Sequence, residues 1–205
     1  PPRGRRSTSA FAMIGSAKDY RDPARRRLPR FLFDYIDDAA NDETTARRNC
    51  ADLQEVALRQ RVLRDVSSIE LGTTLFGTHH RLPIAFAPIG ITGMYARRGE
   101  TQVARAAKDA GLPMCLSTMS LCPLAEVAAT GCPSLWFQLY VIKDRGFMVD
   151  LLARAQAAGC TALVFTVDLP TPGARYRDVH SRMSGSGVAR NAKRVLQALV
   201  RPRWA

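Results

Sequence analysis

Short apolar runs that end in polar or turn-forming residues recur along this chain. They occupy residues 82–88, 112–118, 134–140 and 162–168. Helical patterns follow the first three runs, over residues 98–111, 123–131 and 144–159. Continuous apolar runs that alternate with helices predict parallel strands buried on both faces and joined by right-handed crossovers. The expected fold class is therefore α/β, with all of these strands pointing the same way.

Polar side chains mark the ends of the runs at Ser117, Gln138, Tyr140, Thr166 and Asp168. Parallel strands end at one edge of a sheet or barrel, so these groups should converge where such folds bind ligands. Residues two apart on a strand share a side, which pairs Tyr140 with Gln138 and Asp168 with Thr166. Two hydroxyls and an amide suit the uracil-like edge of a flavin. Alternatively, each side chain only hydrogen-bonds the backbone of a nearby loop. The presence of such residues on several adjacent strands favours a ligand-binding site.

Arginines follow the last run, at Arg175 and Arg177. A guanidinium just beyond a barrel mouth can bind a carboxylate through two parallel hydrogen bonds. A solvated loop arginine is the ordinary alternative. The chain has no G-x-G-x-x-G loop, which argues against a Rossmann dinucleotide site.

The amino-acid composition argues against several classes of function. The 205 residues are 46% hydrophobic, enough for one sizeable core, and no apolar run reaches the roughly 18 residues of a membrane-spanning helix. The five cysteines lack C-x-x-C or metal-ligand spacing, which indicates reduced thiols in a cytoplasm-facing protein and no metal site. The net charge of +12 comes without an aromatic-interleaved basic stripe, so no nucleic-acid partner is expected.

The chain divides into consecutive segments. Residues 1–12 are a basic extension without acidic residues, either a transit peptide or, as we favour, translated upstream sequence before Met13. Residues 13–81 form a helical and connector segment, residues 82–178 carry the strands, and residues 179–205 form a loop and a basic amphipathic segment. Within these, we expect a helix over 16–30 broken near Pro23 and a helix and connector from Thr44 to Arg61 capped by Asp42. We also expect either short strands or a lid at the bottom of a barrel in 62–80, and a loop over 171–187.

Several segments resemble one known family. They are residues 28–35, 56–61, 87–90, 93–100, 116–118, 136–140 and 163–178. They are similar to the FMN-dependent α-hydroxy acid dehydrogenases and oxidases, and nearest to the quinone-linked bacterial branch that oxidises L-lactate. The resemblance runs from about Met13 to the end of the chain. It implies the first half of a (β/α)8 TIM barrel, cut after about four strands and preceded by the helical segment.

The resemblance implies roles for particular residues. FMN would be bound by Ser117, Gln138 and Thr166, and the backbone around Ala87, Pro88 and Gly90 would lie behind the flavin ring. Tyr35, Tyr140 and Arg175 would contact the substrate, an L-2-hydroxy acid oxidised to a 2-oxo acid. Asp168 would orient the catalytic histidine. A quinone would accept the electrons, and the full-length protein would be a homo-oligomer.

The chain also departs from the family pattern. The family's histidine base lies in a Ser-Asn-His-Gly-Gly-Arg stretch that is absent here, and His180 does not match it. The later flavin-binding lysine, carboxylate-binding arginine and phosphate site are absent as well, and Ala39 stands where the family commonly has glycine. We therefore expect an inactive fragment of a lactate enzyme. The alternatives are a glycolate or mandelate enzyme of the same family, or a stand-alone chain that acts only by binding.

The tail over residues 188–204 predicts membrane contact. As a helix it places Val188, Ala192, Val195, Leu196 and Leu199 on one face and basic residues largely on another. Such a helix suits an anionic membrane surface, although it could instead pack on the rest of the barrel. The resemblance favours peripheral attachment to the cytoplasmic side of the bacterial inner membrane.

Overall fold

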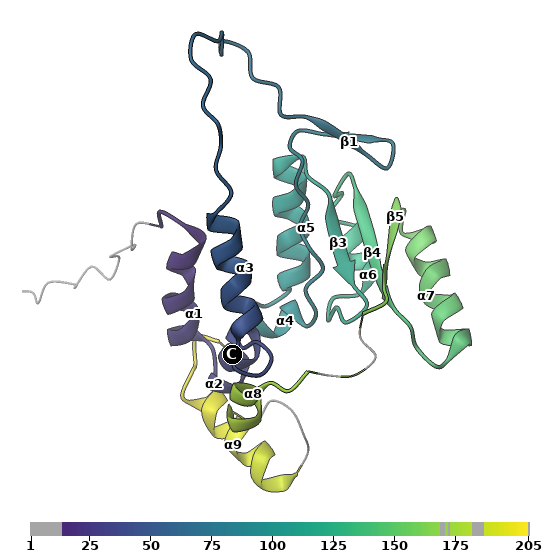
Figure 1. Cartoon of the computed structure of the whole chain (residues 1–205). Helices are drawn as coiled ribbons and strands as arrows, with labels where there is room; N and C mark the ends of the chain where they lie inside the picture. Colours follow the sequence, from purple (N-terminus) through teal and green to yellow (C-terminus); the bar gives the residue numbers. More distant parts are fainter. Residues whose placement is uncertain (1–13, 169–170, 172, 182–186, 205) are drawn as a thin grey trace, which may run out of the picture. The chain divides into compact units, whose positions relative to one another are not determined.

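The computed structural model describes residues 14–168, 171, 173–181 and 187–204 (Figure 1). Contacts divide the chain into two compact units. Unit 1 takes the segments up to Asp42 and from Arg175 onward, and unit 2 runs from Glu43 to Ala174.

Unit 2 is built around a parallel sheet of three strands in the order β3-β4-β5. They are β3 (Met114–Ser117), β4 (Leu135–Tyr140) and β5 (Ala162–Thr166). The helices that alternate with them are α5 (Gly99–Ala110), α6 (Leu124–Ala128) and α7 (Arg145–Ala157). The α/β prediction is confirmed for this segment, and the described strands form no closed barrel.

One face of this sheet forms the core. Leu116 of β3 and Phe137 of β4 pack with Ala104 of α5, Val127 of α6 and Ala155 of α7. Because side chains alternate along a strand, Ser117 and Gln138 point to the opposite face. The register pairs Ser117 with Gln138 and Tyr140 with Thr166, so the polar strand ends lie side by side.

The expected first strand, residues 82–88, is reduced to a single parallel bridge between Phe86 and Met114. Phe86 donates its N–H to Pro113 at 2.9 Å and accepts from Cys115 at 2.9 Å. The next bonds of this ladder would need N–H groups from Pro88 on one side and Pro113 on the other, which proline lacks, and this explains why pairing stops there. The prediction of a full strand was wrong, although the segment runs beside β3 as expected.

Unit 2 also contains elements that precede the sheet. They are α3 (Thr44–Gln54), the antiparallel hairpin of β1 (Thr73–Leu75) and β2 (Thr78–His80), and α4 (Thr92–Tyr95). The hairpin confirms the short strands expected in 62–80. The residue before α3 is Glu43, in a left-handed conformation and without a side-chain cap, so the expected Asp42 cap was wrong.

Unit 1 is helical. It contains a 3-10 turn (Ala17–Tyr20), α1 (Arg21–Arg27), α2 (Arg30–Asp37), α8 (Tyr176–Ser181) and α9 (Val188–Leu199). Pro23 lies inside the first turn of α1, where its missing N–H costs nothing, so the expected break falls earlier, at Tyr20. The expected loop over 171–187 was wrong for residues 176–181, where α8 forms, and its residues 172 and 182–186 lie outside the described residues.

Side chains from distant segments cap the short helices of unit 1. Asp38 Oδ2 accepts from the backbone N–H of Asp178, in the first turn of α8, at 3.0 Å. Gln197 Oε1 accepts from the N–H of Phe31, in the first turn of α2, at 3.0 Å. These bonds satisfy helix N–H groups that have no intrahelical partner.

Candidate functional site

A row of hydrogen-bonded side chains crosses the carboxyl ends of β3, β4 and β5. The Ser117 hydroxyl donates to Gln138 Oε1 at 3.0 Å, and Gln138 Nε2 donates to the Thr166 hydroxyl at 2.7 Å. Ser117 and Gln138 are buried and Thr166 is half-buried. The predicted convergence of these groups is confirmed, while their ligand stays a prediction.

Thr118 and Tyr140 fix the end of β4. The Thr118 hydroxyl donates to the Gln138 carbonyl at 2.5 Å and accepts from the Tyr140 N–H at 3.2 Å. Tyr140 is half-buried and lies on the same side of β4 as Gln138. Sequence reasoning placed Tyr140 here but gave Thr118 no part in holding it.

The backbone at Gly90 passes close to Ser117. The N–H of Ile91 donates to the Met119 carbonyl at 2.8 Å, which ties this segment to the loop after β3. A Cβ placed on Gly90 would lie 3.2 Å from Met119 Cβ and 3.9 Å from Ser117 Oγ. A side chain here would therefore crowd the loop and the polar row. Of the other predicted positions, Ala87 is exposed and Pro88 half-buried.

A buried carboxylate, which sequence reasoning missed, joins the short helix α4 to the loop after β3, beside this row. Glu100 Oε1 accepts from the N–H of Gly93 and from the N–H of Leu121, both at 3.0 Å. Glu100 is 1% exposed. Burial alone would raise its pKa, but the donors at Leu121, Cys122 and Gly93 outweigh burial and lower it. The one sequence feature that could have drawn attention to Glu100 is its position as an acidic residue in the first turn of a helix.

The remaining predicted site residue of unit 2 is Asp168. It is exposed and lies two residues beyond the end of β5. Its predicted role, to orient the catalytic histidine that the resemblance implies, stays a prediction.

Tyr35 and Arg175 lie together in unit 1. The Arg175 guanidinium carbon lies 4.4 Å from the centre of the Tyr35 ring, a cation–π contact. The same guanidinium donates to the Tyr35 carbonyl and, at 3.1 Å, to the Asp38 carbonyl. The two predicted substrate residues are thus neighbours, and the arginine is oriented by the end of α2.

Arginine–aspartate pairs hold α1, α2 and α8 together. Asp37 accepts from Arg21 at 2.7 Å and from Arg177 at 2.7 Å, and Arg177 also donates to Asp38 at 3.2 Å. The hydrogen bond from Arg21, with a further one from Arg177, lowers the pKa of Asp37 although burial opposes it. The sequence left Arg177 as either a carboxylate-binding or a solvated loop arginine, and in the structure it binds the carboxylates of Asp37 and Asp38.

The polar row fits the edge of a flavin ring. Gln138 offers an amide N–H and oxygen and the two hydroxyls can donate or accept, which matches an edge of mixed donors and acceptors. Gly90 leaves open the space that a side chain would fill beside Ser117. The described residues contain no group of three or more metal-ligating side chains.

Comparisons with known proteins point to one family. The sequence profile described as FMN-dependent dehydrogenase matches residues 24–205. An L-lactate dehydrogenase of Caulobacter vibrioides is 61% identical over 193 residues, which cover 94% of this chain and 50% of that protein. An L-lactate dehydrogenase of Pseudomonas syringae pv. syringae is 58% identical with the same coverage. The chain thus spans about half the length of the curated relatives it matches.

Solved structures show the same relationship. The monotopic membrane protein (S)-mandelate dehydrogenase superposes with a TM-score of 0.80 and 36% identity, over 91% of this chain and 50% of that one. A mandelate oxidase superposes with a TM-score of 0.77 and 38% identity, over 82% of this chain and 49% of that one. In the described part of this chain, no helix is long and apolar enough to span a membrane.

Proposed function

Because this chain belongs to the FMN-dependent dehydrogenase family, we propose that the protein containing it oxidises L-lactate to pyruvate and passes the electrons to a quinone. The identity of about three residues in five to proteins named L-lactate dehydrogenase supports this substrate. The quinone acceptor rests on the resemblance to the quinone-linked branch of the family.

The observation that carries the proposal is the Ser117–Gln138–Thr166 row beside Gly90. These side chains would hold the polar edge of FMN, and the backbone around Ala87, Pro88 and Gly90 would lie behind its ring. When bound, FMN takes up the two electrons released from the substrate. The row is already hydrogen-bonded within the protein, so little reorganisation is needed to present it.

The substrate contacts would come from other residues. The Tyr140 hydroxyl would bind the substrate at the end of β4, while Tyr35 and Arg175 would orient its carboxylate. Asp168 would accept a hydrogen bond from the catalytic histidine, hold its orientation and stabilise its protonated form. None of the 205 residues matches that histidine.

Two substitutions in the full-length protein separate the proposed roles. Tyr140→Phe should reduce turnover per bound flavin with FMN retained, because one transition-state hydrogen bond is lost; a cost of about 2–4 kcal/mol is usual. Gln138→Leu should release FMN, because it breaks the polar row. Turnover with a dye acceptor and flavin absorbance after gel filtration measure both effects. Loss of FMN from Tyr140→Phe, with turnover per flavin unchanged, would reverse the assignment.

Other 2-hydroxy acids are the second candidate, since the superposed structures include mandelate enzymes. Turnover of the full-length protein with L-lactate, glycolate and mandelate decides between them. A higher kcat/KM for mandelate or glycolate than for L-lactate would replace the proposed substrate.

Peripheral attachment to the cytoplasmic face of the inner membrane would occur through α9. Its apolar side chains are exposed, with Val195 at 58%, Leu196 at 62% and Leu199 at 72%. Gln197 instead turns toward α2, where it bonds Phe31. An exposed apolar stripe on a basic helix suits a lipid surface, and a superposed relative is a monotopic membrane protein.

The membrane proposal has a direct test. Replacing Val195, Leu196 and Leu199 by Ser in the full-length protein should move the enzyme to the soluble fraction while it retains FMN. If the variant pellets with membranes as fully as the parent, α9 is not the anchor.

A further inference from the structure

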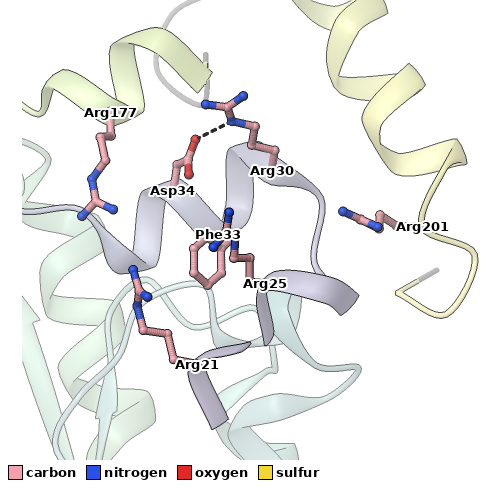
Figure 2. Close-up of a pocket in the computed structure, with 7 residues that line it drawn as sticks. All are labelled: Arg21, Arg25, Arg30, Phe33, Asp34, Arg177 and Arg201. Carbon is pink, nitrogen blue, oxygen red and sulfur yellow. Dashed lines mark hydrogen bonds and ion pairs between the residues drawn. The ribbon is translucent and has the colours of Figure 1, made fainter. Parts of the chain in front are cut away.

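A basic pocket of about 500 Å³ lies within unit 1 (Figure 2). Its walls come from α1, α2, α8 and the turn after α9. Five arginines line it together with Phe33 and Asp34; they are Arg21, Arg25, Arg30, Arg177 and Arg201. No step of the proposed reaction uses this pocket.

Three of the arginines are already paired with carboxylates. Arg21 and Arg177 bind Asp37, and Arg177 also binds Asp38. Arg30 binds Asp34 at 3.2 Å. Three guanidinium groups therefore face three carboxylates, and their charges cancel to a first approximation.

The positive charges of the other two arginines, Arg25 and Arg201, are not balanced by carboxylates. The guanidinium groups of Arg25 and Arg201 form no hydrogen bond or ion pair with any residue that the structure describes. They also line an adjoining hollow, where Asp22 and Arg26 add one charge of each sign. The pocket thus keeps an excess of about two positive charges, carried by side chains from two different segments.

We propose that this pocket binds a phosphate monoester, held mainly by Arg25 and Arg201. A phosphate monoester carries about −1.5 to −2 charges at neutral pH, which matches the excess. A carboxylate carries only one charge and would leave one guanidinium uncompensated. Guanidinium groups bind phosphate oxygens through two parallel hydrogen bonds, and the volume leaves room for the organic part of the ester.

The ester has two possible sources, a soluble metabolite or the headgroup of a membrane lipid. Arg201 lies two residues beyond the exposed Leu199, the last residue of α9. A lipid phosphate could therefore reach the pocket while α9 contacts the membrane. The phosphate site itself does not depend on lactate oxidation or on membrane attachment.

The test uses the full-length, FMN-loaded protein. Glycerol 3-phosphate is titrated by calorimetry, with acetate at equal ionic strength as the comparison. In parallel, sedimentation compares phosphatidylcholine vesicles that contain phosphatidic acid, a monoester, with vesicles that contain phosphatidylglycerol, a diester, at equal surface charge. The variants are Arg25→Gln, Arg201→Gln and the charge-conserving Arg25→Lys. Arg27→Gln is the matched control, because Arg27 is exposed on the same helix but does not line the pocket.

Saturable binding that either glutamine variant weakens about tenfold or more, with Arg27→Gln within about twofold, supports the site. Arg25→Lys should weaken binding several-fold, since lysine keeps the charge but loses the paired donors. Binding of glycerol 3-phosphate identifies a soluble ester, and preference for phosphatidic acid vesicles alone identifies a lipid. The proposal is overturned if neither probe binds, if phosphatidylglycerol serves equally well, or if Arg27→Gln has the same effect as Arg25→Gln.

Discussion

Removal of the Glu100 carboxylate should lower the free energy of unfolding of the protein and weaken its binding of FMN. In Glu100→Ala the N–H groups of Gly93 and Leu121, each 3.0 Å from Oε1, lose their acceptor in a buried place. A hydrogen bond to a charged group contributes about 1.5–3 kcal/mol, so two such bonds give a loss of about 3–6 kcal/mol. Gly93 lies in α4, three residues after Gly90, and Leu121 lies in the loop that follows Ser117, so FMN retention should fall too.

Urea unfolding of the full-length, FMN-loaded protein, followed by circular dichroism, measures the loss, and gel filtration measures bound flavin. Glu100→Gln keeps an acceptor oxygen and should lose about half as much stability. Glu55→Ala is the control, because Glu55 is exposed at the end of α3 and should change stability by less than about 0.5 kcal/mol. A loss below about 1 kcal/mol for Glu100→Ala, or an equal loss for Glu55→Ala, would refute the reasoning.

The pKa of Glu100 gives the same prediction a pH dependence. Its pKa is lower in the folded protein than the value of about 4.3 usual for an unfolded chain. The carboxylate therefore adds stability that is complete above the unfolded pKa and lost as pH falls through the folded pKa. The stability difference between the parent and Glu100→Gln should shrink on acidification below about pH 4. A difference that stays constant from pH 7 to pH 3 would contradict this cause.

Two further predictions concern the 205-residue chain, and a third concerns the full-length protein. The purified chain should not reduce a dye with L-lactate, since it lacks the family's histidine base; activity above a no-protein control would contradict this. It should aggregate and melt without a sharp transition, because Leu163 and Phe165 of β5 are about half exposed; a soluble monomer with a cooperative melt would contradict this. Burial raises the pKa of Cys115 to about 12 and of Cys160 to about 11. In the folded full-length protein at pH 8, iodoacetamide should therefore label exposed Cys50 before these two, and equal labelling of all three would contradict this.

The sequence could predict features that depend on local patterns. The helices α5 and α7 begin and end close to their expected limits, with Gly111 following α5 in the left-handed conformation and Asp144 accepting from Phe147 at the start of α7. The polar row was predictable because residues at the ends of neighbouring parallel strands meet through register alone.

Features that depend on distant partners could not be predicted in this way. The helix α8 follows a Pro- and Gly-containing stretch, and its first turn is capped by Asp38 from the other end of the chain. The basic pocket is likewise assembled from arginines far apart in sequence, each of which reads alone as a solvated side chain. From the sequence, Glu100 indicated only the start of a helix. Its role as an acceptor could not be predicted, because it depends on how α4 and the loop after β3 fold against it.

The long-range caps of unit 1 have a consequence for folding during synthesis. The bonds of the polar row join residues 21 and 28 positions apart, whereas those between α2 and α8 join residues about 140 positions apart. Contacts between near segments form sooner because less loop entropy is lost. The sheet of unit 2 can therefore assemble on the ribosome before α8 has been synthesised and can bind the end of α2. Throughout that interval the apolar side chains of Phe31, Leu32 and Phe33, which are buried in the finished unit, remain open to chaperones and to aggregation.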